Sequence, residues 1–284
     1  MRSIDLHVHS NKSDGSNTPE ELVQLAIEKN LSAFALTDHD TVDGIDDARN
    51  HAAWLRENGT PNIPEIIPGI ELSTEYYGKD IHLLGLYIDH HAPVFCNHLK
   101  YFIESRVERN RKMCANLAAA GIDISYEKLL ALFPDSVITR AHYSVYLVEH
   151  GYSLSKEDAF SQYLGDHTKY FVPRELITPE MGVELILKAG GIPVLAHPIL
   201  YHMSDTRLEE LVSRLKNAGL VGIEAIYSTY NQAEERQIRK LAAKYDLCIS
   251  GGSDYHGIAK PGLELGTGYG KLFIPEDLLQ HLKR

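Results

Sequence analysis

The sequence predicts an α/β fold in which seven strands form a barrel and a small helical subdomain is inserted between two of them. Short apolar or alternating segments recur along the chain, and most are followed by a helical pattern. The connections are short, which is typical of a parallel sheet. Polar residues of the types that bind metals follow several strands, as they do at the rim of a parallel barrel. The chain has 284 residues, enough for one large domain or a core domain with an insertion.

The barrel is assembled from seven predicted strands and six predicted helices. The strands are expected at residues 4–9, 33–37, 65–68 with a continuation toward 72, 81–88, 192–195, 221–226 and 247–250. The helices are expected at residues 19–29, 45–57, 179–189, 207–217, 231–244 and 275–282. The first helix has the clearest start signal, because Thr18 can cap it, Pro19 takes its first position and Glu21 completes a capping box. Leu22 and Leu25 then give it an apolar stripe.

The alternation of strands and helices stops between residues 99 and 172, where only helical patterns occur. Helices are predicted at 102–120, 126–132, 140–150 and 155–163. In the first of these, Phe102 and Met113 belong to the expected inner face, and Arg106 and Arg109 to the expected outer face. A segment of roughly 75 residues can form a small subdomain. We therefore predict a barrel from residues 1–98 and 173–284 and a helical substrate-binding subdomain from residues 99–172.

Composition limits the possible partners. A formal net charge of −11 argues against duplex DNA, since proteins that bind it present basic surfaces. No apolar run is long enough to span a bilayer, and no secretory signal is visible, so no membrane partner and a cytoplasmic location are expected. The three cysteines, Cys96, Cys114 and Cys248, are too few and too far apart to suggest a disulfide framework. The oligomeric state is not predicted. The 15 histidines are the unusual feature.

A His-x-His pair lies in the first predicted strand. Because side chains alternate along a strand, His7 and His9 point to the same face, about 7 Å apart. Two imidazoles at this spacing can converge on one metal ion. A polar strand face with hydrogen-bonded histidines explains the pair equally well, so the pair by itself favours neither interpretation.

Acidic residues and another histidine follow the first two strands. Asp14 lies in a loop rich in Asn, Ser, Asp and Gly, where it would ordinarily be a turn residue. Its position after the His-x-His pair makes it a candidate oxygen ligand. His39 is the best ligand candidate in the run Thr37-Asp38-His39-Asp40. Asp38 and Asp40 could orient histidines from behind, although one of them could instead cap the following helix.

More candidate ligands lie at or near the ends of the later strands. Taken alone, a histidine within an apolar strand would more often be a hydrogen-bonded core residue. The joint occurrence at strand ends is what indicates a site, because those ends form one rim in a parallel barrel. Nitrogen and oxygen ligands without thiolates suit manganese, iron or zinc. These later candidates are Glu71, His82, His197, Asp254 and His256. Glu224 also ends a strand and is expected to support the ligands or the fold.

In this order, the motifs His7-x-His9, Asp14, Thr37-Asp38-His39-Asp40, Glu71, His82, His197 and Asp254-x-His256 resemble those of the polymerase and histidinol phosphatase (PHP) family. The resemblance covers roughly 190 residues on both sides of the insertion. It implies a distorted seven-stranded (β/α)7 barrel with two or three divalent ions, manganese being favoured over iron or zinc. By this resemblance, a first ion is held by His7, His9, Glu71 and Asp254. A second shares Glu71 and is held by His82 and His197. A third is held by Asp14, His39 and His256.

Two motifs in the insertion are similar to those of small bacterial PHP phosphoesterases that act on nucleotides. They are Thr139-Arg140-Ala141-His142 and Lys169-Tyr170-Phe171-Val172-Pro173. The resemblance implies that Arg140, His142 and Lys169 bind the substrate phosphate, and His142 could also protonate the leaving group. The usual patterns are Gly-Arg-Pro-His and Lys-Pro-x-Tyr-Val-Pro. The charged positions match, whereas Thr139, Ala141, Tyr170 and Phe171 depart, which leaves the identity of the substrate open.

The resulting hypothesis is a metal-dependent phosphoesterase that hydrolyses a phosphate monoester of a nucleotide, such as a nucleoside 3′,5′-bisphosphate, with a metal-activated hydroxide. Exonuclease action on a short oligoribonucleotide is the close alternative. A phosphatase for a non-nucleotide metabolite such as histidinol phosphate is a further alternative. A metal-dependent amidohydrolase would predict a Lys or His at the bridging position, where this chain has Glu71. A metal-binding module without turnover is disfavoured, because no ligand of the set is missing.

Overall fold

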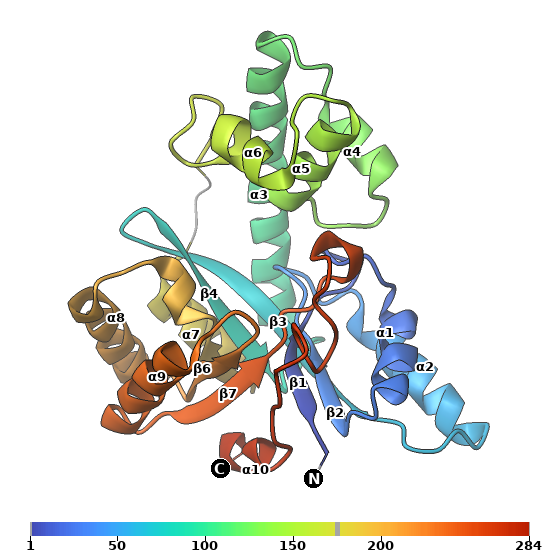
Figure 1. The fold of residues 1–284 in the computed structure, drawn as a ribbon, viewed down its shortest axis with the longest axis vertical. Helices are drawn as coiled ribbons and strands as arrows, with labels where there is room; N and C mark the ends of the chain where they lie inside the picture. Colours follow the sequence, from blue (N-terminus) through green and yellow to red (C-terminus); the bar gives the residue numbers. More distant parts are fainter. Residues whose placement is uncertain (1, 174–176, 284) are drawn as a thin grey trace.

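The computed structural model describes residues 2–173 and 177–283 of the chain. Its centre is one seven-stranded sheet in which the strands follow one another in sequence order (Figure 1). The strands are β1 (Ile4–Val8), β2 (Ala33–Leu36), β3 (Glu65–Tyr76), β4 (Lys79–Leu86), β5 (Ile192–Leu195), β6 (Gly222–Tyr227) and β7 (Cys248–Gly252). All seven predicted strands are therefore present.

The first and last strands meet, so the sheet nearly closes into a barrel. The amide of Asp254 donates to the carbonyl oxygen of His7 over 2.9 Å, and the amide of His9 donates to that of Tyr255, also over 2.9 Å. Val8 and Tyr255 form a parallel bridge at the same place. The predicted barrel is confirmed. Its closure brings the carboxyl ends of β1 and β7, which are far apart in the chain, side by side.

The prediction of an entirely parallel sheet was wrong at one strand. β4 runs antiparallel to both of its neighbours, β3 and β5. The reason is local: β3 continues to Tyr76, and the two turn residues Tyr77 and Gly78, with φ of 51° and 76°, return the chain directly into β4. Because β4 is reversed, its amino-terminal half lies where the other strands have their carboxyl ends. His82 therefore reaches the common rim from inside a strand.

Helices cover the outside of the barrel. Two of them, α1 (Pro19–Glu28) and α2 (Ile45–Glu57), lie together on one side (Figure 1). The helices of the other side are α7 (Pro179–Lys188), α8 (Asp205–Ala218) and α9 (Gln232–Lys244). The capping box predicted at Thr18 and Glu21 is present. The last helix, α10 (Leu278–Leu282), begins later than expected. None of the helices within the described ranges is both long enough and apolar enough to cross a membrane.

The insertion stands on one long helix that rises from the barrel (Figure 1). This helix, α3 (Pro93–Ala119), begins before the predicted start at residue 102. Its first part, including Phe95 and Leu99, packs into the core of the barrel, and Met113 and Leu117 pack into a separate core. The predicted boundary at residue 99 thus falls inside a helix that belongs to both cores. The remaining helices are α4 (Tyr126–Leu132), α5 (Arg140–Glu149) and α6 (Lys156–Ala159), the last continued by a π-helical turn, η1 (Phe160–Leu164).

The orientation predicted for two arginines of α3 was wrong. Arg106 and Arg109, expected on an outer face, have exposed fractions of only 6% and 7%. The periodicity of an isolated helix identifies which residues share a face, but not what covers that face. Here the polar face of α3 forms the roof of a cavity above the barrel rim, and its arginines are enclosed.

Candidate metal centre

Four buried side chains from β1, β3 and the end of β7 converge at the barrel rim. As predicted from strand alternation, His7 and His9 point to the same side. Nε2 of His7 lies 3.2 Å from Oε2 of Glu71 and 3.4 Å from Oδ1 of Asp254. Nε2 of His9 lies 3.2 Å and 3.3 Å from the same two oxygens. Two nitrogens and two carboxylate oxygens thus surround one point, an arrangement that a divalent cation can occupy.

The second oxygen of Glu71 faces another pair of histidines. Oε1 lies 2.9 Å from Nδ1 of His82 and 3.0 Å from Nε2 of His197. These two ring nitrogens are 3.4 Å apart. Glu71 therefore presents one oxygen to each of two groups of nitrogens, which is the geometry of a carboxylate that bridges neighbouring cations.

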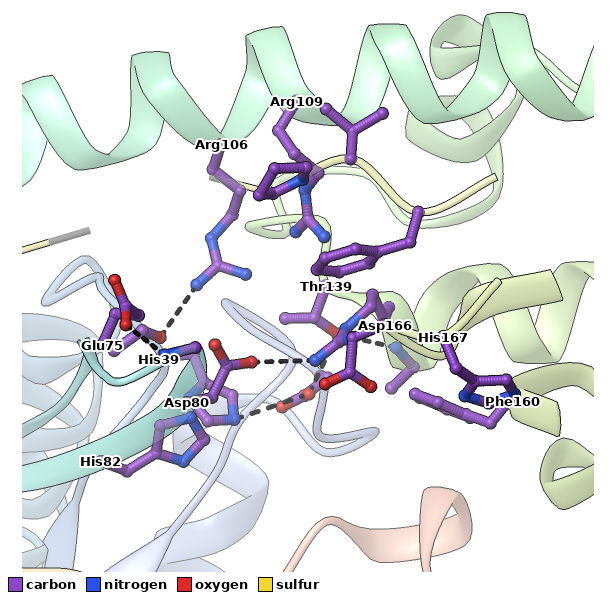
Figure 2. A pocket seen from close by; sticks show the side chains of 18 residues that line it. His39, Glu75, Asp80, His82, Arg106, Arg109, Thr139, Phe160, Asp166 and His167 are labelled. Atoms are coloured by element: carbon purple, nitrogen blue, oxygen red, sulfur yellow. Dashed lines mark hydrogen bonds and ion pairs between the residues drawn. The ribbon is translucent and has the colours of Figure 1, made fainter. Parts of the chain in front are cut away.

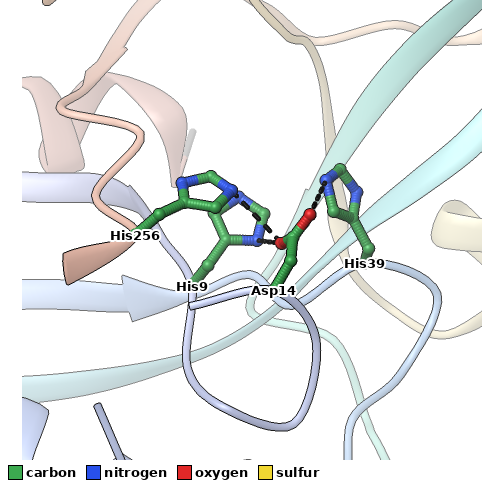
Figure 3. A group of neighbouring side chains, drawn as sticks. All are labelled: His9, Asp14, His39 and His256. Atoms are coloured by element: carbon green, nitrogen blue, oxygen red, sulfur yellow. Dashed lines mark ion pairs between the residues drawn. The ribbon is translucent and has the colours of Figure 1, made fainter. Parts of the chain in front are cut away.

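A third group forms around Asp14, whose carboxylate lies among three imidazole rings (Figure 3). Its Oδ1 is 3.2 Å from Nε2 of His256 and 3.7 Å from Nδ1 of His9. Its Oδ2 is 3.8 Å from Nε2 of His39. The other nitrogen of His39 lies 3.2 Å from Oε2 of Glu71, so the third group adjoins the first two. All nine predicted ligands are thus in one place, as the sequence analysis expected of the barrel rim.

The donor set suits divalent cations, because several of its atoms are buried without a hydrogen bond. Within the described ranges, the affected atoms that face the other ligands are Nε2 of His7 and His9, Oδ1 of Asp14 and Nδ1 of His39. A buried polar atom without a partner costs free energy. Such atoms clustered in one place indicate a ligand that would complete their coordination, and bound cations fit this requirement.

The protonation states of the metal-free site reflect the crowding of its charges. Burial opposes protonation of His9, but the carboxylates of Asp254 and Glu71 outweigh it and raise its pKa to about 9. Burial likewise opposes ionisation of Glu71, yet the neighbouring His39 and His7 hold its pKa well below the usual range. Burial lowers the pKa of His39 to about 3. A proton on His9 therefore supplies part of the positive charge that the carboxylates require.

The ligands are held by a surrounding set of hydrogen bonds. Glu224 on β6 accepts from the backbone amide of His197 over 2.8 Å, and its other oxygen lies 3.2 Å from Nδ1 of His7. The expected support by Glu224 thus has a geometric basis. Asp38 was expected to orient a histidine. Instead it hydrogen-bonds to Ser10 and Ser13, in the loop that carries Asp14.

Three residues of the rim have backbone conformations that are unusual for non-glycine residues. The φ angles of Asp40, His197 and Asp254 are 55°, 25° and 57°. Left-handed conformations of this kind persist only where the surrounding structure enforces them. At Asp254 the amide bond to His7 provides such a constraint. All three residues lie in the segments that follow β2, β5 and β7.

A cavity of about 780 Å³ opens between the rim and the insertion. His39, Asp80 and His82 lie on its barrel side, and Arg106 and Arg109 extend into it from α3 (Figure 2). Arg106 forms an ion pair with Asp40, whose Oδ1 accepts from the amide of Ser73 over 2.8 Å. The predicted ligands Asp14, His39 and His82 thus line a space whose wall also carries three arginines, together with the carboxylates of Glu75, Asp80 and Asp166.

Of the predicted phosphate-binding residues that the structure describes, Arg140 lines this cavity and Lys169 does not. Arg140 lines it, and its Nη2 donates to Oδ2 of Asp80 over 2.8 Å. The guanidinium also lies 5.3 Å from the ring centre of Phe171. Lys169 is exposed, and its ammonium lies 5.1 Å from the ring centre of Tyr170. Among the described residues, those that line the cavity include Arg140 but not Lys169.

His142 has a structural position that the sequence analysis did not anticipate. Its Nδ1 accepts a hydrogen bond from the amide of Thr139 over 2.9 Å, which makes it the third helical residue of a capping box on α5. The hydroxyl of Thr139 in turn donates to Oδ2 of Asp14 over 3.0 Å. Burial lowers the pKa of His142 to about 4. The imidazole is therefore neutral at physiological pH and holds the start of α5 against the metal-site loop.

Four residues near the site were not found by sequence reasoning. Besides Arg106 and Arg109, they are Lys260, whose ammonium lies 2.5 Å from Oδ2 of Asp254, and Tyr227, whose hydroxyl donates to the same oxygen over 2.5 Å. Lysines and tyrosines are not typical metal ligands, so sequence reasoning passed over them. Two positions could have drawn attention: Lys260 lies shortly after the Asp254-x-His256 motif, and Tyr227 is the last residue of β6.

Several known proteins are similar to this chain over nearly its whole length. The sequence profile of the PHP domain matches residues 5–188. The 5′-3′ exoribonuclease Rnm of Escherichia coli K12 is 35% identical over 271 residues, 95% of this chain and 89% of that protein. The 3′,5′-nucleoside bisphosphate phosphatase of Chromobacterium violaceum is 33% identical over 267 residues, 94% of this chain and 91% of that protein. A solved structure of an amidohydrolase from Chromobacterium violaceum, with bound sulfate and no metal, has a TM-score of 0.85 and 31% identity, and the match covers 98% of this chain and 96% of that one.

Proposed function

Because this chain belongs to the PHP domain family, we propose that it is a metal-dependent phosphoesterase that hydrolyses a phosphate monoester of a nucleotide. The observation that carries the proposal is the carboxylate of Glu71, which presents one oxygen to each of two histidine groups beside a cavity lined by arginines. Cations held by the carboxylate and histidines would thus lie beside arginines that can bind a phosphate. The PHP resemblance found in the sequence motifs agrees with the family match.

The residues proposed to hold the cations are those brought together at the rim. His7, His9, Glu71 and Asp254 would hold a first ion. Glu71, His82 and His197 would hold a second. Asp14, His39 and His256 would hold a third. When bound, such ions lower the pKa of water and neutralise charge on a reacting phosphate. The donors are nitrogen and oxygen atoms without thiolates, which suit manganese, iron or zinc. Among these, manganese is the metal that the resemblance to the PHP family favours.

The arginines of the cavity are proposed to bind the phosphate. Arg140 can form two parallel hydrogen bonds to phosphate oxygens, which a planar guanidinium does better than an ammonium. In the structure the guanidinium of Arg140 forms an ion pair with Asp80. A bound phosphate would therefore either displace Asp80 or bind Arg140 together with it. Arg106 and Arg109 enter the cavity from above. We assign Lys169 a peripheral contact at most, since it does not line the cavity among the described residues.

His142 is proposed to position the site rather than to transfer a proton. Its Nδ1 accepts from the backbone amide of Thr139. The lowered pKa also leaves the ring without a proton to deliver as an acid near neutral pH. The ring holds Thr139 at the start of α5, and the hydroxyl of Thr139 in turn donates a hydrogen bond to Asp14.

A nucleoside 3′,5′-bisphosphate is the proposed substrate class, and the 5′ end of a short oligoribonucleotide is the second candidate. The first is supported by the similarity to a 3′,5′-nucleoside bisphosphate phosphatase and the second by the similarity to 5′-3′ exoribonuclease Rnm. Both substrates carry a phosphate beside a ribose and a base. The rings of Phe160 and Phe171 in the cavity wall offer surfaces on which a base could stack.

A direct assay tests the proposal. The purified chain with manganese should release phosphate from adenosine 3′,5′-bisphosphate, and a short 5′-phosphorylated oligoribonucleotide tests the second candidate. Histidinol phosphate and an amide substrate complete the panel. Glu71→Gln and Asp254→Ala should abolish turnover and reduce the bound metal. Glu209→Gln is the matched control, because Glu209 pairs with Lys244 and Tyr245 on the surface. Undiminished turnover in Asp254→Ala would remove the proposal.

A further inference from the structure

A second cluster of metal-binding side chains lies away from the barrel rim, where the loop after β4 meets the first turn of α2. Asp46 belongs to that turn, and His90 and His91 are consecutive residues of the loop that leads into α3. Ligand atoms of all three side chains lie within 4.8 Å of one another. The cluster shares no residue with the nine predicted ligands of the rim.

The geometry of the two histidines is the first argument that this cluster is a site. Neighbouring residues ordinarily direct their side chains apart, yet these two rings lie with their centres 4.1 Å apart. Both address one carboxylate through Nε2: His90 lies 3.0 Å from Oδ1 of Asp46, and His91 lies 3.3 Å from Oδ2. Convergence of two Nε2 atoms on one acidic group is an arrangement that suits a shared cation.

The surrounding backbone holds this arrangement in place. The amide of His91 donates to Oδ1 of Asp89 over 3.1 Å, and the amide of Asp89 donates to the carbonyl oxygen of Ala189 over 2.7 Å. The thiol of Cys96 donates to the carbonyl oxygen of His90 over 3.2 Å. The side chain of His90 is only 6% exposed. The backbone that carries the two histidines, and the His90 side chain, are therefore already ordered.

A cavity beside the cluster leaves room for further ligands of an ion. It has a volume of about 370 Å³ and is lined by the cluster together with Thr41, Cys96 and Lys100. Asp43 also lines it, so the charged groups facing the space are two carboxylates and the ammonium of Lys100. Water can thus reach the Asp46 carboxylate, and three protein ligands with one open position are a common arrangement for zinc.

We propose that Asp46, His90 and His91 bind one divalent transition-metal ion of the zinc class, separate from the ions of the catalytic rim. An ion here joins α2 to the loop that begins α3. Because α3 carries Arg106 and Arg109 into the substrate cavity, the ion braces the element on which the cavity roof depends. The two imidazoles of this set favour zinc, nickel or copper over magnesium or calcium.

The test compares zinc content among the wild type and three variants of the full chain. His91→Ala and Asp46→Asn each remove one ligand, and their side chains are 69% and 51% exposed, so both variants are expected to fold. His98→Ala is the matched control, because His98 is an exposed histidine of nearby α3 outside the cluster. Each protein is equilibrated with zinc, freed of excess by gel filtration and analysed by elemental mass spectrometry.

We expect the wild type and His98→Ala to retain one zinc equivalent more than His91→Ala and Asp46→Asn. Crystals soaked in zinc should show an anomalous peak about 2.0–2.2 Å from the three ligand atoms. Turnover with manganese should persist in His91→Ala, which separates this site from the rim. Equal zinc content in all four proteins, or a soaked crystal without a peak between Asp46, His90 and His91, would overturn the proposal.

Discussion

The guanidinium of Arg106 and the carboxylate of Asp40 form an ion pair that joins α3 to the loop after β2. Both side chains are buried, and Asp40 also accepts a hydrogen bond from the amide of Ser73 on β3. Nη2 of Arg106 lies 3.2 Å from the hydroxyl of Ser73. The pair therefore connects the roof of the substrate cavity to two strands of the barrel, next to the predicted ligand His39.

Removal of this pair should destabilise the protein. Arg106→Met would leave the Asp40 carboxylate buried without this cation, and breaking a buried pair in this way costs about 3–5 kcal/mol. Urea unfolding measures the loss. Arg111→Met is the control on the same helix, since Arg111 pairs with Glu127 at the surface and its removal should cost no more than about 1 kcal/mol. Equal losses in the two variants would contradict the structural role of the pair.

The metal-free protein should lose stability as the pH rises from 6.5 to 9. The folded protein raises the pKa of His9 from 6.5 to about 9, so a proton on His9 stabilises the fold fully below pH 6.5 and ceases to do so as the pH passes 9. This contribution is at most about 3 kcal/mol. The measurement is the free energy of unfolding at pH 6.5 and at pH 9, with a chelator present to keep the protein metal-free. The difference between the two values should be smaller in His9→Asn than in the wild type.

Divalent metal should reverse the dependence on pH. An ion requires an unprotonated imidazole, so its affinity should increase as the pH rises toward 9 and the proton of His9 is lost. Manganese binding can be measured by calorimetry in buffers of different ionisation enthalpy. The observed binding enthalpy should vary with the buffer, which shows that protons are released. Binding without proton release at pH 7 would contradict the assignment of a proton to the metal-free site.

Arg140 should contribute to substrate binding more than to folding. Arg140→Ala removes the phosphate contact proposed above, and hydrogen bonds to charged groups are worth about 1.5–3 kcal/mol, or roughly a tenfold to hundredfold loss in kcat/KM. Arg140→Lys should restore only part of the lost kcat/KM, because an ammonium cannot form the two parallel hydrogen bonds of a planar guanidinium. Steady-state kinetics with the nucleotide substrate measure the effect. Wild-type kinetics in Arg140→Ala would place the phosphate elsewhere.

His142→Ala distinguishes a positioning residue from an acid. Loss of the contact to Thr139 should destabilise α5 by about 0.5–2 kcal/mol, as expected for a lost cap. If His142 positions the site, kcat falls by a similar factor for good and poor leaving groups and the pH profile keeps its shape. His142→Asn, which can still accept from Thr139, should recover part of the stability. A selective loss with poor leaving groups would instead restore the role of proton donor.

How much of the molecule could be predicted depended on the range of the interactions involved. Strand positions, the capping box at Thr18 and the shared face of His7 and His9 follow from local periodicity, so the sequence revealed them. The reversal of β4 was missed, because the predicted strands ended toward residue 72 and began again at 81, and the two-residue turn lay unrecognised in the gap between them. The family motifs singled out the nine predicted ligands, because each follows a strand or lies within one.

The sequence by itself determined a seven-stranded barrel with a helical insertion and the identity of the residues that meet at its rim. Only the tertiary structure decided that Arg106 is enclosed above Asp40 and that His90 and His91 converge on Asp46. The physical reason is that backbone periodicity records which face a residue occupies, whereas burial and ion pairing depend on segments that folding brings to that face. Those segments lie far away in the chain, and no local pattern specifies their contacts.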